Sequence, residues 1–102
     1  MKTLTQDNFN QEIATWVTLV DFWAERCGPC RMLTPVLEKL SDQIVDVKFT
    51  KVNIDDEQDL ASKFGIMSIP TVIVFKDGEL VDQIVGLNPE NIYQSRLDKI
   101  KE

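Results

Sequence analysis

Histidine is absent from this sequence of 102 residues. Its absence excludes serine–histidine and cysteine–histidine catalysis, and it removes imidazole from the available metal ligands. Glycine is also scarce. The four glycines stand at positions 28, 65, 78 and 86, too far apart to form the Gly-x-Gly-x-x-Gly loop that cradles a dinucleotide. We therefore expect neither a metal nor a bound cofactor.

Basic residues and long apolar runs are few as well. Eleven Lys and Arg residues stand against 17 Asp and Glu, and the formal net charge is -6. Nucleic acids and anionic membrane surfaces bind basic patches, so neither is an expected partner. No apolar run approaches the roughly 20 residues that span a bilayer, and the opening MKTLTQDNFN lacks the apolar core of a secretion signal. These features predict a cytoplasmic protein, in a compartment that keeps thiols reduced.

Five stretches are rich in β-branched and apolar residues or are bounded by turn signals, which is typical of strands. They are residues 3–5, 17–23, 45–54, 71–75 and 79–86. Asp77-Gly78 between the last two indicates a β-hairpin. The strand–helix–strand unit over residues 17–53 predicts a right-handed parallel crossover. The hairpin then adds antiparallel strands to the same sheet. Length and uniform composition predict one domain over residues 1–102.

Helical spacing of apolar residues occurs in four places, three between these strands and one after the last strand. We expect Thr5 to cap a first short helix, and a long second helix to run from the cysteines to about residue 43 with a bend at Pro35. Gly65 should end a third, short helix. Asn88 as N-cap and Pro89 as first residue should open the last one.

Both cysteines lie in the stretch DFWAERCGPCR, residues 21–31, where a buried strand gives way to the long helix. Four interpretations compete. A zinc or shared iron–sulfur site would need further ligands from carboxylates or a second subunit. A structural disulfide closing so small a ring would contribute only about 2 kcal/mol. A helix start with Gly28 and Pro29 between the cysteines is a poor place for the core packing of two ordinary buried thiols. A redox-active dithiol fits the position best.

The chemistry of a helix start favours that interpretation. Cys27 would face unpaired backbone N–H groups and the positive end of the helix dipole, which stabilise a thiolate, the reactive form. Pro29 is acceptable in the first turn because its missing N–H has no helical partner there. Cys30 comes round to the same side one turn later. It should be less exposed than Cys27 and harder to ionise.

Two other segments should meet Cys27 at one edge of the sheet. In open α/β sheets, sites gather beyond the carboxyl ends of the strands. Cys27 follows the carboxyl end of strand 17–23. If strand 71–75 runs antiparallel to it, Pro70 begins at the same edge, and the returning hairpin strand ends there at Gly86.

The segments VDFWAERCGPCRM, SIPTVIVFKDG and Val85-Gly86 resemble the thioredoxin family, and the order of elements is similar from end to end. The resemblance implies an α/β thioredoxin fold, with a central mixed five-stranded sheet flanked by four helices. It implies thiol–disulfide exchange with Cys27 as nucleophile and Cys30 as resolving cysteine. One position departs from the family pattern: Arg26 replaces the tryptophan that usually precedes the first cysteine. This departure bears on the redox potential and on the choice of partners.

Asp21 is the candidate proton acceptor for Cys30. It lies inside the apolar stretch TLVDFW, where burial should raise its pKa toward neutral pH. The alternative is a carboxylate that only holds backbone groups at the end of the sheet. The family has a buried aspartate at this place, and Lys51 on the neighbouring strand matches its lysine partner. By itself, Lys51 is typical of an ordinary exposed strand residue.

The resemblance also implies a groove for an extended segment of the partner protein, with Pro70 as a cis-proline facing the dithiol. The groove residues are Trp23, Ile69, Pro70 and Gly86, with Met67 and Leu87 at its edge. A tryptophan at position 23 also fits plain core packing.

The expected function is that of a monomeric protein-disulfide reductase acting on cytosolic partner proteins. By resemblance, an NADPH-dependent flavoprotein, thioredoxin reductase, would return it to the dithiol form. Two other functions stay open. One is a specialised relative with a less reducing potential or one dedicated partner, for which Arg26 is the argument. The other is a non-catalytic docking module.

Overall fold

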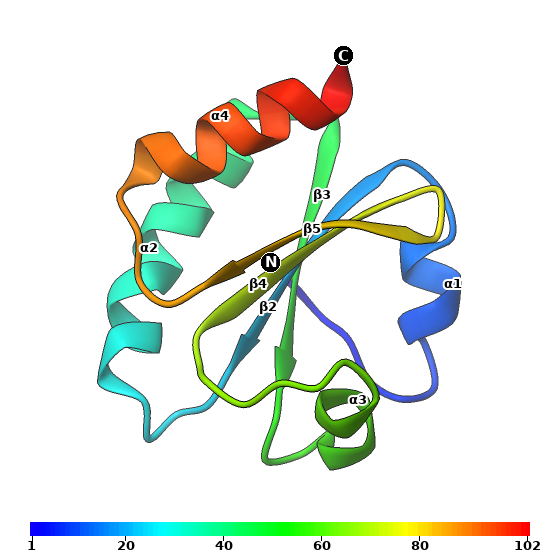
Figure 1. Cartoon of the computed structure of the whole chain (residues 1–102), viewed down its shortest axis with the longest axis vertical. Coiled ribbons are helices and arrows are strands. Elements are labelled where there is room, and N and C mark those ends of the chain that lie inside the picture. Colours follow the sequence, from blue (N-terminus) through cyan, green and yellow to red (C-terminus); the bar gives the residue numbers. More distant parts are fainter.

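A central five-stranded sheet organises the chain in a computed structural model that describes residues 1–102 (Figure 1). The strand order is β1-β3-β2-β4-β5. β1, β3 and β2 run parallel, whereas β4 is antiparallel to β2, and β5 is antiparallel to β4. The expected mixed sheet is therefore confirmed. The strands are β1 (Lys2–Thr3), β2 (Val17–Trp23), β3 (Val47–Asn53), β4 (Thr71–Lys76) and β5 (Glu79–Val85).

Four helices cover the two faces of this sheet. They are α1 (Phe9–Ile13), α2 (Gly28–Gln43), α3 (Gln58–Lys63) and α4 (Glu90–Lys101). In Figure 1, α2 and α4 lie together on one face, and α1 and α3 lie on the other. None of the four is both long and apolar enough to cross a membrane.

A separate apolar core fills each interface between sheet and helices. The first core joins Leu19 of β2 to Leu33 and Leu37 of α2 and to Tyr93 of α4. The second core holds Val20 and Phe22 of β2 against residues of α1 and α3. β2 is buried on both faces because it is the central strand. Since side chains alternate along a strand, Asp21 shares the face of Leu19 and points toward the α2 and α4 layer.

The ends of α1 and α4 differ from the sequence-based expectation. α1 begins at Phe9, and Thr5 does not cap it. Instead, the side-chain Oδ1 of Asn8 accepts a hydrogen bond from the backbone N–H of Thr5 at 2.7 Å. The N-cap of α4 is Pro89, so the helix starts one residue later than expected. The side chain of Asn88 donates to nearby backbone carbonyls in place of capping the helix.

Two strand ends also differ. β3 begins at Val47, because Val45 lies in the turn after α2 and is 88% exposed. β1 pairs with β3 only through Lys2 and Thr3, so it lies earlier than the expected 3–5. The hairpin strands and Gly65, which follows α3 with a φ of +62°, agree with the expectation.

Candidate active site

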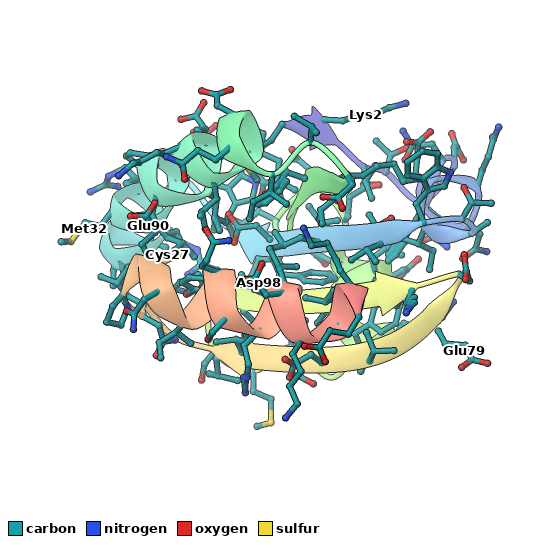
Figure 2. The ribbon with its side chains drawn as sticks, turned by 90° about the horizontal axis from the view of Figure 1, so that it is seen from above. Lys2, Cys27, Met32, Glu79, Glu90 and Asp98 are labelled. Carbon is teal, nitrogen blue, oxygen red and sulfur yellow. A yellow bond between two sulfur atoms is a disulfide. The ribbon has the colours of Figure 1, made fainter.

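The two cysteines occupy the start of α2, and Figure 2 shows Cys27 at one edge of the molecule. Cys27 is the N-cap residue and Cys30 lies in the first turn, and a disulfide joins them with their Cα atoms 5.2 Å apart. The backbone N–H of Cys30 donates a hydrogen bond to Sγ of Cys27 at 3.2 Å. Cys30 is fully buried, whereas Cys27 is 9% exposed. The helix start therefore directs a donor at the sulfur that reaches the surface, which favours a thiolate there after reduction.

The loop before β4 meets the dithiol at this edge. The carbonyl oxygen of Ile69 lies 3.7 Å from Sγ of Cys27, and the Ile69–Pro70 peptide bond is cis. The N–H of Gly86, just after β5, donates to the carbonyl of Pro70 at 2.8 Å. Three segments distant in the sequence therefore converge as expected.

Apolar side chains surround the sulfur atoms. Trp23, Ile54 and Ile69 are partly buried and pack against the small cluster that contains both cysteines. Met67 is 96% exposed and Leu87 is 42% exposed. Ile54 is a neighbour of the dithiol that the sequence reasoning missed. Its position immediately after β3, at the same edge as the end of β2, was the signal that could have identified it.

Asp21 is a buried carboxylate without a hydrogen bond to its Oδ1 atom, and it is 1% exposed. Burial raises its pKa to about 7, and the positive charge of Lys51 opposes this rise without cancelling it. Lys51 lies directly across from Asp21 in the β2–β3 pairing. It forms no ion pair with the carboxylate, and its Nζ atom lies 5.1 Å from the centroid of the Trp23 ring. Asp21 therefore changes its protonation state near neutral pH.

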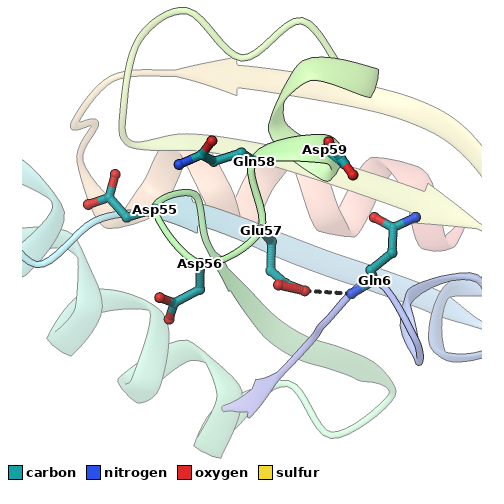
Figure 3. Close-up of a pocket in the computed structure, with 6 residues that line it drawn as sticks. All are labelled: Gln6, Asp55, Asp56, Glu57, Gln58 and Asp59. Carbon is teal, nitrogen blue, oxygen red and sulfur yellow. Dashed lines mark hydrogen bonds between the residues drawn. The ribbon is translucent and has the colours of Figure 1, made fainter.

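Arg26 points to an acidic loop that follows β3. Its guanidinium forms an ion pair with Asp55 at 3.2 Å, and both side chains are largely exposed. A shallow pocket of about 330 Å³ lies along this loop, and no cysteine lines it (Figure 3). Among the residues that line it, Glu57 accepts a hydrogen bond from the backbone N–H of Gln6 at 2.6 Å. The charge of Arg26 is thus partly balanced by a carboxylate.

The cysteine pair at this edge of the sheet can alternate between a dithiol and a disulfide. This is the reaction of a thiol–disulfide oxidoreductase. Comparison with known proteins identifies the family of oxidoreductases to which the chain belongs. The family model described as Thioredoxin matches residues 1–99. The chain belongs to the thioredoxin family.

Individual relatives agree along nearly the whole chain. A thioredoxin of Chlamydia caviae is 52% identical over 91 residues, covering 89% of each sequence, and one of Bacillus subtilis is 45% identical over 96 residues, covering 93% of this chain and 92% of that protein. Among solved structures, a mutant thioredoxin from Halobacterium salinarum superposes with a TM-score of 0.93 at 36% identity, covering 99% of this chain and 90% of that one.

These findings confirm the thioredoxin fold and the assignment of Cys27 and Cys30 to dithiol–disulfide exchange. The protein is therefore a protein-disulfide reductase of the thioredoxin type, which works with disulfide substrates and a reductase. Among the interpretations of the cysteine pair, the redox-active dithiol is the correct one.

Replacing Asp21 with Asn should stabilise the fold in a pH-dependent way. The native carboxyl has a pKa of about 7 when folded and 3.8 as a free group, so the folded state holds the proton more tightly. The free energy of unfolding of the native protein therefore falls as the pH rises from about 4 to 7. The asparagine variant does not lose this stability, because its side chain does not ionise. The gain should be small at pH 4 and reach at most on the order of 4 kcal/mol above pH 8.

Urea unfolding of both proteins between pH 4 and 8 measures this gain. Asp56→Asn is the matched control, because Asp56 is exposed in the acidic loop and its replacement should change the free energy of unfolding by less than about 0.5 kcal/mol. A gain for Asp21→Asn that stays constant with pH would contradict the assignment.

Proposed function

We propose that this chain, as a single monomeric domain over residues 1–102, reduces disulfides of partner proteins in the cytoplasm. The observation that carries the proposal is the asymmetry of the dithiol. Cys27 reaches the surface beside the carbonyl of Ile69, while Cys30 is fully buried behind it. This difference supports Cys27 as the sulfur that meets a partner and Cys30 as the sulfur that meets only Cys27.

In the first step, the Cys27 thiolate attacks one sulfur of the partner's disulfide. The partner's S–S bond breaks, its second sulfur leaves with the electron pair, and a mixed disulfide joins Cys27 to the partner. The N–H of Cys30 and the helix start hold negative charge on Cys27 before the attack.

In the second step, Cys30 attacks the sulfur of Cys27 and releases the partner's remaining thiolate. The Cys27–Cys30 disulfide forms, so the partner has gained two electrons and the chain has lost two. Cys30 must first lose its proton, and we assign Asp21 as the acceptor. A pKa of about 7 and a carboxylate oxygen free of hydrogen bonds support this role. Lys51 keeps that pKa from rising further.

The partner segment would lie in the groove formed by Trp23, Ile69, Pro70 and Gly86. The half-buried state of Trp23, Ile69 and Gly86 leaves part of each at the surface beside Cys27. An extended segment could add to the backbone of residue 69, in the manner of a strand that pairs with an exposed edge. Met67 and Leu87 supply apolar surface at the rim.

An NADPH-dependent flavoprotein, thioredoxin reductase, would supply the two electrons that restore the dithiol. The spacing of the four glycines leaves no dinucleotide loop in this chain, so the electrons come from a separate protein. A coupled assay that follows NADPH consumption with such a reductase and insulin as substrate tests the whole proposal.

Two alternatives are distinguished from this proposal by other measurements. A specialised relative would equilibrate near the potential of glutathione and show a less reducing dithiol. A docking module would keep its function in cells after both cysteines are changed to serine. The Arg26–Asp55 pair beside the dithiol is the observation that favours testing the first alternative.

Cys30→Ser should accumulate mixed disulfides between Cys27 and partner proteins, because no thiol remains to release them. Non-reducing electrophoresis of the variant after mixing with insulin measures the trapped species. Cys27→Ser is the matched control and should trap nothing. Partners trapped on Cys30 in that control would reverse the proposed order of attack.

Asp21→Asn should slow the second step by at least about tenfold and leave the first step nearly unchanged, because a general base is lost only where Cys30 ionises. In the native protein the rate of the second step should rise with pH through about 7, as the carboxylate forms. Stopped-flow measurement of mixed-disulfide formation and decay separates the two steps. Unchanged decay would leave Asp21 with a structural role.

Arg26→Trp should move thiolate formation at Cys27 to higher pH, because it removes a positive charge and leaves Asp55 unpaired. The reduced form is then less stable, and the reduction potential becomes more negative. Asp55→Asn should act in the opposite direction, since it leaves the guanidinium unpaired. Ultraviolet titration of the thiolate at low and high salt compares the variants. Superimposable curves would show that Arg26 does not tune the dithiol.

A further inference from the structure

The carbonyl of Gly86 accepts two hydrogen bonds from side chains. The hydroxyl of Tyr93 donates to it at 3.1 Å, and Nδ2 of Asn88 donates to it at 3.1 Å. Asn88 also donates to the carbonyl of Val85 at 3.2 Å. Both lone pairs of the Gly86 oxygen are therefore used, by one residue of the loop and one of α4.

Apart from the bond that its own N–H donates to the carbonyl of Pro70, Gly86 is held by these two bonds to its carbonyl. Its φ is +87°, in a region where glycine moves freely at low energy. A Cβ atom built on Gly86 would meet nothing within 4 Å, so no side chain packs against it on that side. Hydrogen bonds therefore constrain this residue on a side where no side chain would block its rotation.

Tyr93 is suited to act as a permanent donor. It is fully buried in the core between the sheet and the α2 and α4 layer, so its ring cannot change position without disturbing that core. Burial raises the pKa of its hydroxyl above the usual 10. The hydroxyl therefore keeps its proton at neutral pH and continues to donate.

A series of contacts connects Gly86 to the dithiol. The N–H of Gly86 donates to Pro70 at 2.8 Å, and the preceding carbonyl, that of Ile69, lies 3.7 Å from Sγ of Cys27. A residue of α4 is thus connected through Gly86 and Pro70 to the surface beside the nucleophile. Every link in this series is a hydrogen bond or a peptide bond until the last contact.

We propose that Tyr93 and Asn88 are positioning residues, which fix Gly86 so that a partner segment docks with its disulfide in line with Cys27. The inference rests on the proposed groove. It concerns substrates that occupy the groove, so it applies to protein disulfides and not to small disulfides that reach Cys27 alone. Neither residue touches the reacting sulfur atoms.

Tyr93→Phe tests the inference, because it removes the hydroxyl and keeps the buried ring. The reduced protein is mixed with insulin or with a small aromatic disulfide, and the second-order rate constant is measured for each. We expect the rate constant for insulin to fall about three- to tenfold, the usual effect of one hydrogen bond. The rate constant for the small disulfide should stay within about twofold, and the Gly86 amide should exchange its hydrogen faster.

Two further variants sharpen the result. Asn88→Asp keeps the size of the side chain and removes the donor, so it should show the same selective loss, and the double variant should lose more than either. Ser95→Ala is the matched control: it removes a hydroxyl from α4 that donates only to Ile92 of the same helix. It should behave as the native protein does.

Equal losses with insulin and the small disulfide would overturn the inference, since Tyr93 would then act on the dithiol itself. Faster exchange at Gly86 without any loss of insulin reduction would also overturn it. If the native protein reduced the small disulfide but not insulin, the proposed function would fail, and this inference would fall with it.

Discussion

The antiparallel pairing of β2 with β4 is the contact on which the site depends. It places Phe22 opposite Thr71, so the loop before β4 ends where the chain leaves β2 for the dithiol. Cys27 and the Ile69 carbonyl meet only because these two strands share one register. Because β4 is buried on both faces, a shift by one residue would exchange its side chains between the two cores and would carry Pro70 away from the sulfur atoms.

The burial that creates the core also creates the chemistry of Asp21. The carboxyl lies on the same face of β2 as Leu19, beneath α2 and α4, where a charge is poorly solvated. Its raised pKa therefore means that the charged carboxylate costs stability at neutral pH, and the same pKa suits the base that we propose for Cys30. Lys51 moderates this effect from the neighbouring strand while its ammonium group lies over the Trp23 ring.

Two different kinds of interaction act around the dithiol: an exposed ion pair at the surface, and a hydrogen bond that comes from the core. Arg26 and Asp55 form an exposed pair, which is weak and sensitive to salt. Gly86, in contrast, is fixed by a donor that lies in the core. On the proposed function, the surface pair would adjust the electrostatic environment of Cys27, whereas the bond from α4 would set the shape of the groove.

Spacing and polarity along the chain were enough to predict the order of the strands and helices, the dithiol at the start of α2 and the burial of Asp21. They misplaced the starts of α1, α4 and β3 by a few residues, since capping and turn geometry depend on neighbouring backbone. The folded chain alone reveals that Asn88 binds carbonyls and does not cap α4, that Arg26 pairs with Asp55, and that Tyr93 reaches Gly86. The physical reason is the same in each case: a polar side chain bonds to whichever partner folding brings within about 3 Å, and sequence spacing does not record that distance.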